Sequence, residues 1–160
     1  MYFFRKQIVI VIIFFACCLL TVSCADSPVV QCTKFTEIVT RGNALIDTQK
    51  NNNDVGTTKN LAKNLNQTAQ QLESLRITDT NLKEFQSQSV KSFRDLGQAI
   101  GEIGKALEAG NLASISIEGR EQIRKAQTDL VKAGQQANQA AANQDALTDK
   151  LINYCKSDRS

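Results

Sequence analysis

Hydrophobic residues recur at spacings of three and four along most of the chain after residue 26. This spacing places them on one face of an α-helix, whereas a half-buried strand would show strict alternation. The first stripe follows Ser27-Pro28, a typical helix start because the serine hydroxyl can cap free amides and proline lacks an N–H. Its members are Val29, Cys32, Phe35, Val39, Gly42 and Ile46. The polar cluster 50–56 is expected to end this helix.

Two further stripes predict a second and a third helix. The second consists of Leu61, Leu65, Thr68, Leu72 and Leu75. The third consists of Leu82, Phe85, Val90, Phe93, Leu96, Ile100, Ile103 and Leu107. We expect Asp79 or Thr80 to cap the third helix. Gly110 is expected to end that helix, and Asn111 to cap the start of the next one.

A fourth stripe predicts the last long helix. Its members are Leu112, Ile115, Gly119, Ile123, Ala126, Leu130, Ala133, Ala137 and Ala140. The periodicity continues through Leu147, Leu151 and Tyr154, but a single helix over 112–155 would be about 66 Å long, far longer than its neighbours. We therefore expect a bend or break near Asn143-Gln144-Asp145, followed by a short helix.

These patterns predict an all-α protein without a β-sheet. Four helices with short connections form an antiparallel up-down-up-down four-helix bundle, here with a short fifth C-terminal helix where the fourth one breaks. The bundle is expected to be a single domain over residues 26–160. The start of the first helix and the end of the last then lie at the same end of the bundle.

Residues 1–25 are typical of an export signal. Arg5 and Lys6 precede an uncharged run over 8–25 that ends in small residues. Ser23-Cys24-Ala25 suits ordinary cleavage, while Val22-Ser23-Cys24 resembles a lipobox, at which bacterial lipoproteins are cut and acylated on cysteine; Thr21 departs from that pattern. A third alternative is an uncleaved anchor, because 18 uncharged residues reach the lower limit for a membrane span. In each case the remaining chain faces away from the cytoplasm, in the periplasm or cell envelope or secreted.

The cysteines divide between the signal and the bundle. Cys17, Cys18 and Cys24 belong to the signal, which leaves Cys32 and Cys155. An even pair in an oxidising compartment predicts a disulfide, and the expected topology brings both cysteines to one end of the bundle. The alternative is two unpaired buried thiols. Two thiolates without histidine cannot complete a zinc site.

Charge and composition argue against several classes of function. Without Arg5 and Lys6 the chain has 17 basic and 16 acidic residues, so no nucleic-acid partner is expected. Histidine is absent and the one methionine is Met1. The usual general base, the Glu-x-x-His pairs of di-iron bundles and the usual haem ligands are therefore missing. We expect neither an enzyme nor a bound cofactor or metal.

Three glycines interrupt the third helix at Gly97, Gly101 and Gly104. Each costs about 1 kcal/mol relative to alanine, so some contact should compensate. We expect them to permit close helix packing against Gly119, Ala126 and Ala133 of the fourth helix, the alternative being a flexible point or a groove for a partner. The amide-rich stretch 135–144 has only a weak apolar face, and we expect it to be mobile or to complete its core against another molecule.

Short motifs resemble a group of small exported bacterial proteins, cyanobacterial among others, whose function is uncharacterised. The residues that carry the resemblance are Gln31-Cys32, Leu82 with Phe85-Gln86, and Ile152-Asn153-Tyr154-Cys155. The resemblance implies a helical bundle with a terminal disulfide and supplies no activity.

The function expected from these observations is an extracytoplasmic binding or scaffold module. It would be attached to the membrane by an N-terminal lipid or anchor and contact an envelope protein. The alternative is a small-ligand or stress-sensing bundle with an apolar pocket beside the glycines. An enzyme would need a cleft with perturbed carboxylates.

Overall fold

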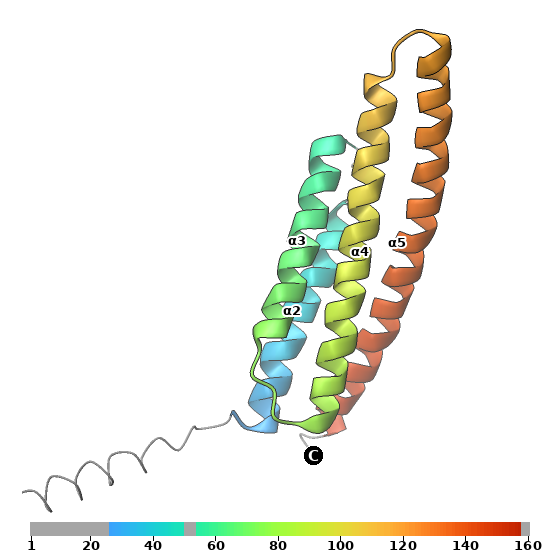
Figure 1. The fold of residues 1–160 in the computed structure, drawn as a ribbon. Coiled ribbons are helices and arrows are strands. Elements are labelled where there is room, and N and C mark those ends of the chain that lie inside the picture. The colour runs from blue at the N-terminus through green and yellow to red at the C-terminus, as the bar shows by residue number, and fades with distance from the viewer. Residues whose placement is uncertain (1–25, 50–53, 158–160) are drawn as a thin grey trace, which may run out of the picture.

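The computed structural model describes residues 26–49 and 54–157. The expected signal segment, with Cys24, and positions 50–53 of the expected turn lie outside them. The described residues form four helices and no strand: α2 (Pro28–Gln49), α3 (Val55–Ser74), α4 (Thr80–Leu112) and α5 (Ile117–Ser157). They lie side by side in alternating directions (Figure 1). The predicted all-α four-helix bundle is confirmed.

Each of the four described helices starts at a side-chain oxygen that accepts a hydrogen bond from the amide three residues further along. The capping residues are Ser27, Asp54, Asp79 and Ser116. Ser27 and Asp79 act as predicted, whereas the cap expected at Asn111 is instead Ser116, because α4 continues two residues beyond Gly110. Hydrogen bonds from Thr57 also lower the pKa of the Asp54 carboxyl.

The break predicted near residue 144 is wrong, because α5 is continuous over 41 residues. The polar triplet that suggested it lies on two sides of one helix: Asn143 and Asp145 are exposed, and Gln144 is buried. The Gln144 amide nitrogen contacts the Thr148 hydroxyl at 3.3 Å, and that hydroxyl donates to the Gln144 carbonyl at 2.8 Å. The Gln144 side-chain oxygen is buried and has no hydrogen-bond partner among the described residues. The helix nevertheless continues without a break.

Two of the helices are much longer than the other two. At 1.5 Å per residue, α5 extends about 60 Å and α4 about 50 Å, compared with about 30 Å for α2 and α3. The lower part of the molecule is therefore a four-helix bundle. Its upper part is a hairpin of α4 and α5 that continues beyond the ends of the other two helices (Figure 1).

The core changes character along this length. In the four-helix part it contains large, fully buried side chains from all four helices: Phe35, Val39, Leu65, Leu72, Leu82, Phe93, Leu96 and Leu151. Further along α4 and α5, toward their connection, the buried residues are mostly alanines: Ala99, Ala106, Ala126, Ala133 and Ala137. Small side chains let α4 and α5 approach closely, but such a seam buries less apolar area than the core below.

Candidate functional site

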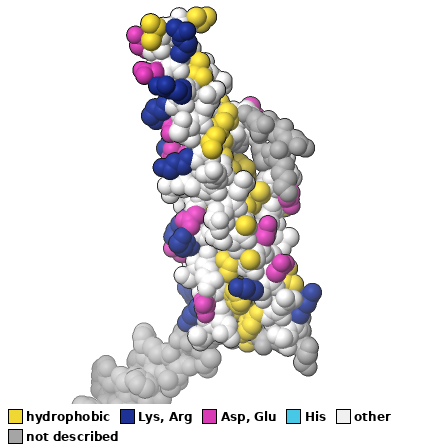
Figure 2. Space-filling model, turned by 90° about the vertical axis from the view of Figure 1, so that its right-hand side faces the viewer, with side chains coloured by type: hydrophobic (Ala, Val, Ile, Leu, Met, Phe, Trp, Pro, Cys, Tyr) yellow, Lys and Arg dark blue, Asp and Glu magenta, His cyan; other side chains and the backbone are white. Residues whose placement is uncertain are grey.

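Three large hydrophobic side chains are exposed at the end of the hairpin. Leu112 is the last residue of α4, Ile117 is the first of α5, and Ile115 lies in the connection between them. Leu112 is 78% exposed, Ile117 is 70% exposed and Ile115 is fully exposed. We call these three residues the tip patch. Figure 2 shows hydrophobic side chains at this end of the molecule and in a column that continues down the same face.

The connection that carries the tip patch has a defined geometry. The Ser114 and Ser116 hydroxyls lie 3.0 Å apart, and the Ser116 amide donates to the Ser114 carbonyl. A Cβ on Gly119 would lie 1.8 Å from that carbonyl oxygen, so only glycine fits there. Gly119 therefore serves the turn, because the three atoms nearest to its Cβ position all belong to Ser114 and none to the glycines of α4. The tip patch therefore lies on a turn that is closed by hydrogen bonds within the turn.

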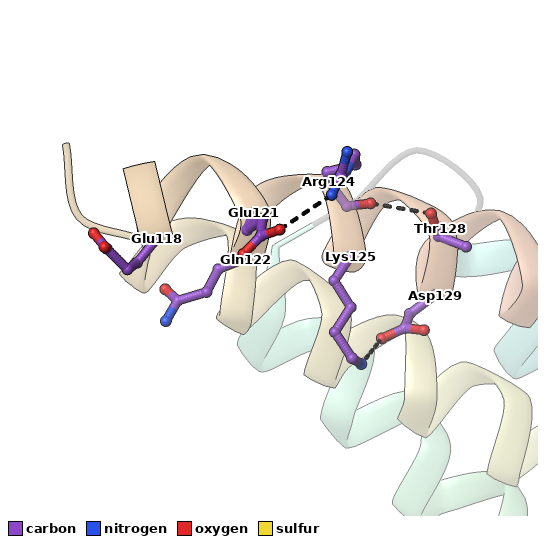
Figure 3. Close-up of a pocket in the computed structure, with 7 residues that line it drawn as sticks. All are labelled: Glu118, Glu121, Gln122, Arg124, Lys125, Thr128 and Asp129. Carbon is purple, nitrogen blue, oxygen red and sulfur yellow. Dashed lines mark hydrogen bonds and ion pairs between the residues drawn. The ribbon is translucent and has the colours of Figure 1, made fainter. Parts of the chain in front are cut away.

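The charges behind the tip patch neutralise one another. On the outer face of α5, Arg124 contacts Glu121 at 3.3 Å, and Lys125 contacts Asp129 at 2.6 Å (Figure 3). This hydrogen bond and the charge of Asp129 raise the pKa of Lys125. Hydrogen bonds from its own backbone amide and from the Ser116 hydroxyl lower the pKa of Glu118. Between residues 102 and 132 the chain carries five basic and five acidic residues, so the hairpin presents no excess of either charge.

The same helix surface carries a hollow of about 590 Å³ (Figure 3). All of its lining residues come from α5: Glu118, Glu121, Gln122, Arg124, Lys125, Thr128 and Asp129. Because a single helix cannot enclose a ligand, this is an open depression between polar side chains. Ligand sites instead combine enclosure, apolar walls and a few convergent polar groups.

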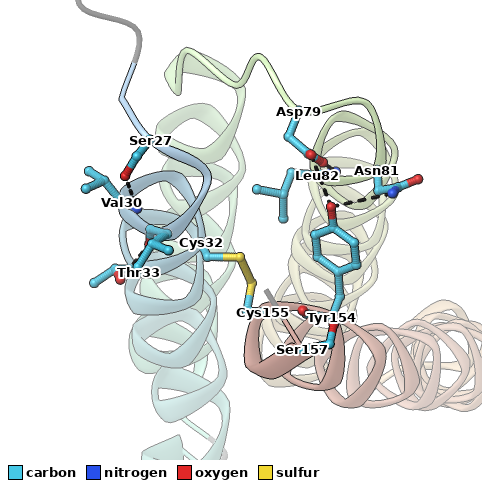
Figure 4. The surroundings of a disulfide bond; sticks show 11 residues. Ser27, Val30, Cys32, Thr33, Asp79, Asn81, Leu82, Tyr154, Cys155 and Ser157 are labelled. Atoms are coloured by element: carbon cyan, nitrogen blue, oxygen red, sulfur yellow. Dashed lines mark hydrogen bonds between the residues drawn. A yellow bond between two sulfur atoms is a disulfide. The ribbon is translucent and has the colours of Figure 1, made fainter. Parts of the chain in front are cut away.

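The opposite end of the molecule is held by the Cys32–Cys155 disulfide, which joins the start of α2 to the end of α5 (Figure 4). Both cysteines are buried. Sequence had placed them at one end of the bundle, and here they meet with their Cα atoms 5.7 Å apart. The disulfide is compatible with an extracytoplasmic, oxidising compartment.

Hydrogen bonds surround the disulfide and reach the connection between α3 and α4. The buried Gln31 side chain donates to the Thr78 hydroxyl at 2.7 Å and accepts from the Thr78 amide at 2.8 Å. The Tyr154 hydroxyl donates to Asp79 at 3.1 Å (Figure 4), and its ring lies 5.8 Å from that of Phe85. We call the disulfide together with Gln31, Thr78, Asp79, Phe85 and Tyr154 the basal clamp.

Gln86 extends the basal clamp to the end of α3. Its amide nitrogen donates to the carbonyls of Leu72 and Leu75, at 2.6 and 2.9 Å. These carbonyls lie in the last turn and at the C-cap of α3, where they also accept from the amides of Leu75 and Ile77. The motifs quoted for the family resemblance thus converge on one end of the bundle, where their contacts are structural.

The glycines of α4 contact a different helix from the one predicted. A Cβ on Gly97 would lie 2.9 Å from Asn66 and 3.2 Å from the Ala62 carbonyl, and one on Gly104 would lie 3.1 Å from Lys59. All of these neighbours belong to α3. Gly101 has only ordinary contact distances, with Ala62 at 3.8 Å. The small residues of α5, in contrast, pack against α4 through its alanine seam.

None of the described helices has both the length and the apolar character needed to cross a bilayer. Among the same residues, no group of three histidine, cysteine, aspartate or glutamate side chains is arranged to hold a metal ion. Comparisons with family models, with curated proteins and with solved structures find no match to this chain.

Proposed function

We propose that the protein is a non-enzymatic spacer of the cell envelope, which is tethered at the end that carries the basal clamp and binds a protein partner through the tip patch. The observation that carries this proposal is the exposure of Leu112, Ile115 and Ile117 together on a closed turn. Single exposed hydrophobic residues are ordinary, but three of them within six positions at the end of an extended element favour an interaction surface.

The shape of the molecule supports a spacer. α2 begins at the end with the disulfide, so a tether that precedes residue 26 would leave from there, while the tip patch lies at the far end of α5 (Figure 1). The distance between the two ends is about 60 Å, the length of α5. A covalently closed base and a continuous helix would hold the tip patch at a fixed distance from a membrane.

The chemistry of the tip favours an apolar protein surface as its partner. The charges behind the tip patch are balanced and paired, so the hairpin offers no cationic surface to nucleic acid or to anionic lipid headgroups. The hollow on α5 is open and polar, which gives no support to a small-ligand site. An uncharged pocket of an envelope protein would accept side chains such as Ile115.

A photoreactive amino acid placed at Ile115 in the native host tests this proposal. We expect covalent adducts with one partner, because Ile115 would lie inside the interface. The matched control is the same amino acid at Lys156, which is exposed at the opposite end.

In a second test the triple change Leu112→Ser, Ile115→Ser and Ile117→Ser should weaken partner binding at least about tenfold. It should leave thermal unfolding almost unchanged, since surface changes usually stay within about 0.5 kcal/mol. Equal adducts at both positions, or undiminished binding by the triple variant, would contradict the proposal.

Mass spectrometry of the mature N-terminus tests the tether separately. A lipoprotein would begin at Cys24 and carry the added mass of a diacylglyceryl group, and Cys24→Ala should then release the protein from the membrane fraction. Cleavage after Ala25 would give an unmodified soluble chain, and an uncleaved anchor would keep Met1. Full-length protein in the cytosol with both thiols free would refute export and with it the envelope role.

A further inference from the structure

The outer face of α5 carries a stripe with no neighbour among the described helices. The stripe begins at Arg120 and Arg124, passes Val131 and Gly134, and ends at Asp145 and Asp149. These positions follow one another at helical spacings and share one side of α5, away from its buried alanines. All are exposed except the half-buried Gly134, and Val131 is 62% exposed. The chain has no charged residue between positions 133 and 144.

Gly134 serves no purpose that the isolated chain explains. A Cβ there would meet nothing within 4 Å, and its φ is not positive. In the interior of a 41-residue helix, alanine would fit and would favour the helix more than glycine does. The glycines at 42, 97, 104 and 119 all have a neighbour that restricts the space. The absent side chain at 134 does, however, leave room for another backbone to approach.

The charged residues of the stripe are arranged symmetrically about Gly134. Those before it are basic and those after it are acidic. Arg124 and Asp145 lie 10 and 11 positions on either side of Gly134, and Arg120 and Asp149 lie 14 and 15 positions away. In an antiparallel copy of the same helix centred there, each arginine would face an aspartate. A parallel copy would set arginine against arginine. Among the described residues, Arg120, Asp145 and Asp149 make no ion pair within the chain, so they are available for such contacts.

We propose that a second copy of this chain packs antiparallel along α5, with Gly134 at the crossing point and Arg120 and Arg124 facing Asp149 and Asp145 of the second copy. The arrangement has twofold symmetry, so each contact occurs twice. It covers the outer side of a hairpin whose own seam consists mostly of alanine. The ion pairs fix direction and register, while Val131 and the uncharged residues around Gly134 provide the buried area. It goes beyond the spacer role. Because the copies are antiparallel, the tip patch of each lies beside the base of the other, so the pair applies to copies that are not both tethered to one membrane.

Sedimentation of the protein, purified as the cell processes it and kept in mild detergent, tests this pairing. We expect a concentration-dependent dimer. Arg124→Asp should raise the dimer dissociation constant at least about tenfold, because two like-charge contacts replace two favourable ones. Asp145→Arg should have a similar effect. The combined charge swap should restore the dissociation constant to within about threefold of the wild type, because each pair is re-formed with its signs exchanged. The matched control is Lys132→Asp, an exposed charge on another side of α5, which should leave dimerisation unchanged.

A substitution at Gly134 distinguishes an effect on dimerisation from an effect on folding. Gly134→Leu should abolish the dimer by blocking the close approach, while the monomer keeps its helical circular dichroism because the space at 134 is open. A protein that stays monomeric at every concentration would overturn the proposal. So would a dimer that the two single charge changes do not weaken, or one that the swap does not restore. Adducts of Ile115 with a different protein still test the spacer role separately, whereas adducts between two copies of this chain would report the antiparallel pair.

Discussion

Reduction of the Cys32–Cys155 disulfide is expected to lower the free energy of unfolding by about 4–5 kcal/mol. The two cysteines are 123 positions apart, so the bond closes nearly the whole described chain into one loop. In the chain-entropy model, opening a loop of that size stabilises the unfolded state by about this amount. Small domains have total stabilities of about 5–15 kcal/mol, so the loss would be a large part of the total.

Denaturant unfolding with and without a reducing agent measures this effect. The midpoint should fall on reduction, and the dependence on denaturant should steepen because the unlinked unfolded chain exposes more surface. The control is the double change Cys32→Ser and Cys155→Ser, which should resemble the reduced wild type and should not respond to the reducing agent. An unchanged midpoint for the reduced wild type would contradict the prediction.

The disulfide could be predicted because it depends only on helix count and residue type. An even number of antiparallel helices brings the start of the first and the end of the last together, and Cys32 and Cys155 occupy those places. Capping was readable at Ser27 and Asp79 for a similar reason, since a cap depends on a few neighbouring residues. Features fixed by local chemistry or by topology alone are thus accessible from sequence.

Other features depend on which helix packs against which. The spacing of hydrophobic residues predicts the buried face of a helix but does not identify the neighbouring helix. Leu112 and Ile115 continue the stripe of the fourth helix and were expected in its core, but α2 and α3 do not extend far enough to cover them. Gly97 was assigned to the wrong partner because α3 and α5 flank α4 on different sides. The break near Gln144 was predicted from an expected length limit, although α4 is itself long enough to support a continuous α5 over much of its length. The tip patch was missed for the same reason, since its exposure follows from unequal helix lengths.

Gly42 has the most restricted space among the helix-packing glycines. A Cβ there would lie 2.6 Å from the Cζ atom of Phe93 and 2.7 Å from the Cγ2 atom of Thr68. The Phe93 ring is fully buried among residues from several helices, so it cannot move aside without disturbing the core. The glycine in the first hydrophobic stripe therefore provides the space into which the largest core side chain of α4 fits.

Gly42→Ala is accordingly expected to lower the free energy of unfolding by about 1–3 kcal/mol, the usual cost of overpacking a core. This would occur although alanine favours a helix by about 1 kcal/mol over glycine. The same change at Gly134, where the space is open, is the matched control and should stabilise the monomer. In a Phe93→Leu background the clashing ring atoms are absent but Thr68 Cγ2 remains, so the cost of Gly42→Ala should become smaller there without vanishing. Denaturant unfolding of the four proteins in this cycle measures the coupling between the two positions. If Gly42→Ala costs the same in both backgrounds, the ring is not what restricts residue 42, and helix α2 must be held at that distance from α4 by other contacts.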